Sequence, residues 1–82
     1  MEKHQKTEQS HAKKTGASNV EYDLFSEMHS LLKSNFALEQ YIEDAREAGN
    51  REVESAFKTI HDQNRENVTK LRELIGRQLG AA

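Results

Sequence analysis

Two segments with apolar residues at helical spacing, joined by a single glycine, constrain the fold of this chain more than any other feature. In the first segment the stripe advances by alternate steps of four and three residues: Leu24, Met28, Leu31, Asn35, Leu38, Ile42 and Ala45. That spacing is typical of a helix packed along one face. Gly49 suits the left-handed residue that ends a helix, and Asn50 can cap the next helix. So short a connection predicts two antiparallel, adjacent helices.

The second segment carries a stripe of similar length: Val53, Ala56, Phe57, Ile60, Asn64, Asn67, Val68, Leu71, Leu74, Ile75 and Leu79. We therefore expect a helical hairpin over 20–79, with helices over 20–48 and 51–77 and a turn at 49–50. Proline is absent from the 82 residues, and the four glycines lie at or outside the ends of the periodic segments. The predicted fold class is all-α.

The hairpin has little material for a core. Residues 1–19 contain no large apolar side chain after Met1, so we expect a disordered N-terminal tail. The remaining chain, roughly 60 residues, is of a size at which a partner subunit, a metal or a covalent staple is often needed. Cysteine is absent, which excludes disulfides and thiolate metal ligands.

The net charge of the chain is −2, and it is unevenly distributed along the sequence. Residues 1–19 hold four lysines and two glutamates, whereas the remainder holds 8 basic and 12 acidic side chains. An acidic helical body argues against a nucleic-acid partner, which needs a basic face. No apolar run reaches the length of a membrane span, and the N-terminus lacks the apolar core of a secretory signal. We expect a cytoplasmic protein without a membrane partner.

The stripe of the first helix is wider than one partner helix can cover. Phe25, Leu32 and Phe36 extend it on one flank, beside Met28. Surplus apolar surface of this kind is typical of a second interface. The four residues are our candidate oligomer interface, and they predict a homodimer, or a higher oligomer, in which two hairpins form a four-helix bundle.

Polar residues fall within both stripes. With the turn at 49–50, residues face each other when their numbers sum to about 99, which pairs Asn35 with Asn64. Asn67 and Glu39 lie within about one turn and complete a candidate polar core layer. One interpretation is that buried amides fix the register and the oligomeric state, because any slip leaves them unpaired.

A metal site is the alternative interpretation of this layer. Di-iron bundles take a Glu from one helix and a Glu-x-x-His pair from the next, so that both side chains project inward. Here the pair at the right depth is Asn64 and Asn67, and amides are weaker ligands than carboxylate or imidazole. Glu39 is the one weak candidate ligand, and iron or another divalent metal is the alternative to having no cofactor.

The stretch from Tyr41 to Asn50, followed by a second helix of matching length, resembles a ferritin-like helical hairpin. It is most similar to the small encapsulated ferritin-like proteins and the single-hairpin relatives of rubrerythrin. The resemblance covers roughly residues 22–76 and implies a four-helix bundle made by dimerisation. The family's ligand positions correspond to Ser34, Asn64 and Asn67, so the resemblance implies the fold with its metal ligands lost.

The predicted function is therefore a non-catalytic oligomerisation or interaction protein. No Ser-His-acid group can be built on two such helices, and no glycine-rich phosphate loop is present. His29 and His61 are interpreted as residues at the edges of the stripes. Two alternatives stay open: a metal-binding ferritin-like protein with a degenerate site, and an adaptor hairpin whose wide stripe accepts the helix of a protein partner.

Overall fold

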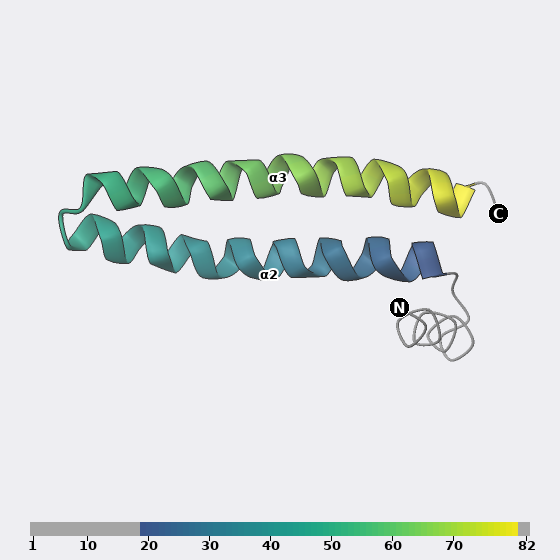
Figure 1. Ribbon diagram of the computed structural model, residues 1–82, viewed down its shortest axis with the longest axis horizontal. Helices are drawn as coiled ribbons and strands as arrows, with labels where there is room; N and C mark the ends of the chain where they lie inside the picture. Colours follow the sequence, from purple (N-terminus) through teal and green to yellow (C-terminus); the bar gives the residue numbers. More distant parts are fainter. Residues whose placement is uncertain (1–18, 81–82) are drawn as a thin grey trace, which may run out of the picture.

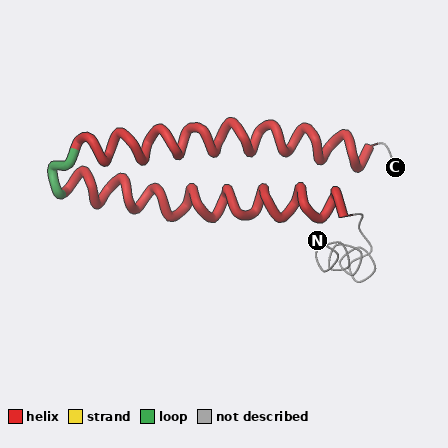
Figure 2. The backbone as a smooth tube through the Cα atoms, viewed as in Figure 1, coloured by secondary structure: helices red, strands yellow, loops and turns green. Residues whose placement is uncertain are grey.

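The computed structural model describes residues 19–80, which form two helices and the turn between them. Helix α2 (Asn19–Glu47) and helix α3 (Arg51–Gly80) run antiparallel and side by side, so Asn19 and Gly80 lie at the same end (Figure 1). Figure 2 shows one reversal of the chain and no strand in this range. The predicted all-α hairpin is confirmed. The tail expected over 1–19 lies outside the described residues, apart from Asn19, which is helical.

The turn has the hydrogen bonds of a Schellman motif. Asn50 N–H donates to the carbonyl of Ala45 at 2.9 Å, and Gly49 N–H donates to that of Arg46 at 3.0 Å. Gly49 has a φ of 72°, a conformation that costs a residue with a Cβ atom about 1–2 kcal/mol. The Oδ1 atom of Asn50 then accepts a hydrogen bond from Val53 N–H at 3.1 Å, so Asn50 caps α3 as its sequence position predicts.

The seam between the helices follows the predicted stripe of α2. Every member of that stripe is buried or half-buried, and the buried apolar side chains of the hairpin are Leu38, Ala45, Val68 and Ile75. The expected register also holds, because Asn35 bonds to Asn64 and the two numbers sum to 99. The turn fixes this register, since shifting either helix by one residue would remove the bonds that Gly49 and Asn50 make.

The stripe predicted for α3 is wrong in its rotation. Val53, Ile60 and Leu79 are exposed, whereas His61 and Glu54 are half-buried in the seam. The seam of α3 follows Glu54, Phe57, His61, Asn64, Val68, Leu71 and Ile75, again in steps of three and four. The apolar surface of α3 is wider than the strip that α2 covers, so one edge of it faces outward.

Helix α3 also runs further than predicted, to Gly80 in place of residue 77. Gly76 lies inside it, at a cost of about 0.8–1.0 kcal/mol relative to Ala. Ile75, just before that glycine, is the last buried residue of α3, and residues 76–80 are exposed. Charged residues recur along both helices, and neither is apolar enough over a sufficient length to cross a membrane.

Candidate functional site

A pair of asparagines forms the polar centre of the hairpin. Asn64 donates from Nδ2 to Oδ1 of Asn35 at 2.9 Å, and Asn35 donates from its own Nδ2 to the backbone carbonyl of His61 at 3.0 Å. Asn35 is only 7% exposed. Its amide group therefore has a partner at each end, which offsets the cost of removing it from water. The predicted pairing of Asn35 with Asn64 is confirmed.

The other two members of the predicted layer do not join it. Asn67 is exposed and lines a separate cleft with Leu31, Leu71 and Leu74. Glu39 is also exposed, and its Oε2 atom lies 3.4 Å from Nε2 of His61. The rotation of α3 explains both differences, because it moves Asn67 and Ile60 to one edge of the helix and His61 into the seam.

His61 was predicted to lie at the edge of the stripe, but it lies in the seam between the helices. Its side chain is 18% exposed and approaches the carboxylate of Glu39, while its backbone carbonyl accepts the hydrogen bond from Asn35. A signal for this position exists: counting back by sevens from Ile75 and Val68 gives 61 and 54, which are two of the three polar members of the α3 seam.

Three residues correspond to the metal-ligand positions of ferritin-like proteins, and they do not fit an iron site. Ser34 offers a hydroxyl, and Asn64 has already directed its amide N–H toward Asn35. Asn67 is exposed on another side of the hairpin. Over residues 19–80 no three His, Asp or Glu side chains are grouped so that they could hold a metal ion. The Glu39–His61 pair supplies two donors at most.

The aromatic flank predicted in the sequence, made of Phe25, Leu32 and Phe36 beside Met28, lies at the surface of α2. Phe36 is 81% exposed and Leu32 is 50% exposed, whereas Met28 is half-buried in the seam. A groove of about 340 Å³ runs along this flank and is lined by Leu32, Asn35, Phe36, Glu39, His61 and Arg65. The groove thus combines apolar side chains from α2 with Glu39 of the same helix and with His61 and Arg65 of α3.

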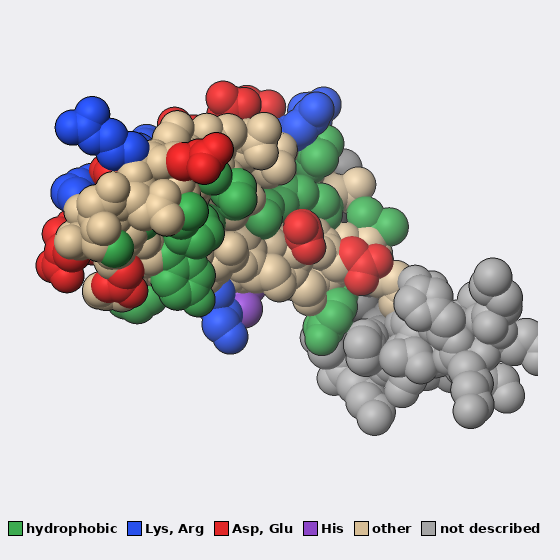
Figure 3. All heavy atoms as spheres, turned by 60° about the vertical axis from the view of Figure 1, so that its left-hand side comes forward, with side chains coloured by type: hydrophobic (Ala, Val, Ile, Leu, Met, Phe, Trp, Pro, Cys, Tyr) green, Lys and Arg blue, Asp and Glu red, His purple; other side chains and the backbone are tan. Residues whose placement is uncertain are grey.

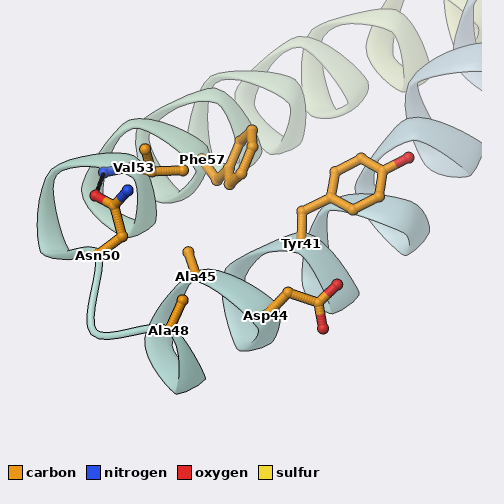
Figure 4. A pocket seen from close by; sticks show the side chains of 7 residues that line it. All are labelled: Tyr41, Asp44, Ala45, Ala48, Asn50, Val53 and Phe57. Carbon is orange, nitrogen blue, oxygen red and sulfur yellow. Dashed lines mark hydrogen bonds between the residues drawn. The ribbon is translucent and has the colours of Figure 1, made fainter.

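A second apolar groove lies near the turn. Tyr41 from α2 and Phe57 from α3 place their ring centroids 5.7 Å apart at an angle of 49°, a favourable tilted arrangement. Figure 4 shows Val53 beside the Phe57 ring on α3, with Ala45 and Ala48 below on α2 and the Tyr41 hydroxyl pointing away from the turn. The groove measures about 420 Å³ and has the carboxylate of Asp44 at its edge. In Figure 3 hydrophobic side chains reach the surface of the hairpin between charged ones.

A small ionic cluster closes the turn end of the seam. Arg46 on α2 lies 3.0 Å from Glu54 on α3, and Lys58 lies 3.2 Å from the same Oε2 atom. The hydrogen bond from Lys58 and the one from Arg46 lower the pKa of Glu54 below its ordinary value. Because Arg46 comes from α2 and Lys58 from α3, this carboxylate joins the two helices near the turn.

The described side chains thus give the hairpin two apolar surfaces and one internal amide pair. Comparison with protein-family models, with curated proteins and with solved structures finds no match to this chain.

Proposed function

We propose that this chain is a non-catalytic self-association module, in which two hairpins pack through the aromatic flank to make a four-helix bundle. The observation that carries the proposal is the exposure of Phe36 beside Leu32 on one side of α2. Large apolar side chains that adjoin each other on a surface usually mark an interface. The bundle would be of the ferritin-like type without a competent di-iron site.

The size of the core supports a partner of the same kind. Among residues 19–80, four apolar side chains are buried, and none of the large ones is completely enclosed. A core of this size leaves a small domain marginally stable. Covering a Phe or Leu side chain contributes about 1.5–3 kcal/mol. Two copies that cover each other's Phe25, Leu32 and Phe36 would therefore gain a stabilisation comparable to that of the hairpin core.

The amide pair gives such a bundle its alignment. Asn35 lies at the base of the groove that also contains Leu32 and Phe36. Sliding α2 along α3 would separate Asn35 from Asn64 and from the carbonyl of His61. The flank of each copy is consequently presented in one fixed arrangement, which is the role that buried asparagines have in coiled coils.

Sedimentation of the full chain tests the proposal. At micromolar concentration the protein should sediment as an oligomer, and the Leu32→Ser/Phe36→Ser variant should have a lower mass with unchanged helicity. Val20→Ser is the control, because Val20 is exposed but lies outside the flank. A wild-type chain that is folded and monomeric would overturn the proposal. So would a flank variant that keeps the full mass, and dye binding to the wild-type flank would then favour the adaptor role.

A further inference from the structure

Glu39 and His61 place two metal-binding side chains in the groove beside the aromatic flank. Glu39 comes from α2 and His61 from α3, and both line this groove with Leu32 and Phe36. Glu39 Oε2 lies 3.4 Å from His61 Nε2, farther than the roughly 2.7–3.2 Å of most N–H···O hydrogen bonds. Two ligands of a tetrahedral Zn²⁺ ion, with bonds of about 2.0–2.2 Å, lie about 3.3–3.6 Å apart. The two atoms therefore have the spacing of neighbouring zinc ligands.

The other ring nitrogen of His61 faces a second carboxylate. Nδ1 lies 4.0 Å from Oδ1 of Asp62, whose side chain is exposed and can rotate to close this distance. A metal-bound histidine usually donates its second ring N–H to such a group, which fixes the tautomer and leaves the other nitrogen for the metal. The backbone at His61 is also held, because its carbonyl accepts a hydrogen bond from Asn35. The lone pair of Nε2 is then directed toward Glu39.

The charges around His61 favour one divalent cation for every two chains. Glu39 and Asp62 are acidic, and Arg65, which lines the same groove, is basic. With His61 in the neutral form that binds a metal, these groups give each chain a net charge of −1 at this place. Two chains in contact here bring −2 together, which one Zn²⁺ ion neutralises.

We infer that Glu39 and His61 of two copies together bind one Zn²⁺ ion in the flank contact. One chain supplies two donors, whereas a structural zinc site has four, so the site is incomplete without the second copy. A two-fold axis parallel to the helices sets each flank residue opposite its own counterpart, and both pairs then meet at one level. The inference rests on the proposed self-association and makes it responsive to zinc. These ligands differ from Ser34, Asn64 and Asn67, the positions that correspond to those of ferritin-like proteins.

Metal titration of a chain with a single imidazole tests the site. The chain has four histidines, and replacing His4, His11 and His29 by Gln leaves only His61. In this background, calorimetric titration should find one Zn²⁺ ion for every two chains. Co²⁺ as a spectroscopic probe should give the intense visible absorption of a tetrahedral complex. Sedimentation at low protein concentration should show more dimer with zinc than with EDTA.

Substitutions in the same background assign the ligands. His61→Gln and Glu39→Gln should each abolish binding at one ion per two chains, while the dimer measured in EDTA remains. Asp62→Asn should keep that stoichiometry but weaken zinc affinity about 10–100-fold, because it removes the group that orients the ring. Glu73→Gln is the matched control and should change neither measurement, since Glu73 is also an exposed acid on α3 but lies twelve residues after His61.

The outcomes separate this inference from the proposed function. If the chain is dimeric in EDTA but binds no zinc, or one ion per chain, the zinc site is overturned and the flank contact stands. If the chain is monomeric both in EDTA and with zinc, both are overturned. A Glu39→Gln variant that still binds one ion for every two chains would also contradict the inference, because other residues would then supply the donors.

Discussion

Asn64 donates its amide to the Oδ1 atom of Asn35 across the seam, and Asn35 in turn donates to the backbone carbonyl of His61. The two bonds join α2 to α3 at a single level, near the middle of both helices. An amide pair contributes little net free energy compared with apolar packing. Its structural consequence is specificity, because only one register of the two helices satisfies it.

This relationship predicts opposite effects for single and double substitutions. Asn64→Ala should destabilise the hairpin by about 1–3 kcal/mol, because the buried Oδ1 of Asn35 loses its donor. The Asn35→Leu/Asn64→Leu variant should be as stable as the wild type or more stable, since it replaces both partners by apolar groups. Urea unfolding followed by circular dichroism measures both. A double variant less stable than Asn64→Ala would show that the amides do more than satisfy each other.

The register of the hairpin could be predicted from the sequence because local chemistry determines it. Gly49 and Asn50 define where one helix ends and the next begins, and the positions of all facing pairs follow from that. The stripe of α2 could also be predicted, since only the series from Leu24 to Ala45 continues along the whole helix, whereas the flank of Phe25, Leu32 and Phe36 gives way to Glu39.

The rotation of α3 could not be predicted in the same way. Phe57, Asn64 and Leu71 belong to two overlapping series with steps of three and four residues. One series continues through Ile60 and the other through His61, and the first is the more apolar. Which of the two faces α2 depends on the direction from which α2 approaches, a tertiary property that the periodicity of one helix does not contain. The exposed positions of Asn67 and Ile60 follow from this.

The ionic cluster at the turn end predicts a pH-dependent contribution to stability. Lys58 and then Arg46 hold the pKa of Glu54 below its ordinary value of 4.5. Because the folded-state pKa is lowered, the stabilisation is present above the unfolded pKa and is lost as the pH falls through the folded one. Glu54→Gln should therefore lower the melting temperature at neutral pH, and the difference should disappear in acid.

Glu52 provides the control for that measurement, since it also lies in the first turn of α3 and has the same favourable interaction with the helix dipole. Glu52→Gln removes a charge that interacts with the helix dipole but leaves the contacts of Glu54 with Lys58 and Arg46 intact. Thermal unfolding at several pH values should give Glu54→Gln the larger loss near neutrality. Equal losses for the two variants would show that the cation contacts of Glu54 contribute nothing measurable.

Two glycines should respond in opposite directions to the same substitution. Gly49→Ala should cost about 1–2 kcal/mol, because the φ of 72° is unfavourable for a residue with a Cβ atom, although no atom crowds the new methyl group. Gly76→Ala should stabilise the protein by about 0.8–1.0 kcal/mol, since it is inside α3 with open space around it. Chemical denaturation measures both, and a stabilising Gly49→Ala would contradict the proposed turn conformation.

Substitutions of Phe57 and of Phe36 should have different effects, because Phe57 belongs to the core of the hairpin and Phe36 to its proposed interface. Phe57 is half-buried and its ring contacts that of Tyr41, whereas Phe36 is exposed. Complete burial would make Phe57→Ala cost about 3–5 kcal/mol, so a half-buried ring should cost roughly half of that. With a total stability of about 5 kcal/mol, Phe57→Ala should lower the melting temperature and the helicity on warming.

Phe36→Ala should weaken assembly. The exposed Phe36 ring contributes little to the stability of the single hairpin, but it is a large part of the proposed interface. Its helicity at high protein concentration should match that of the wild type, while its mass in sedimentation should decrease at lower concentrations. The measurement is a dilution series of both variants, with circular dichroism and sedimentation on the same samples. If Phe36→Ala instead loses helicity at every concentration while Phe57→Ala does not, then the seam and the aromatic flank have exchanged roles, and the arrangement of α2 against α3 described above is wrong.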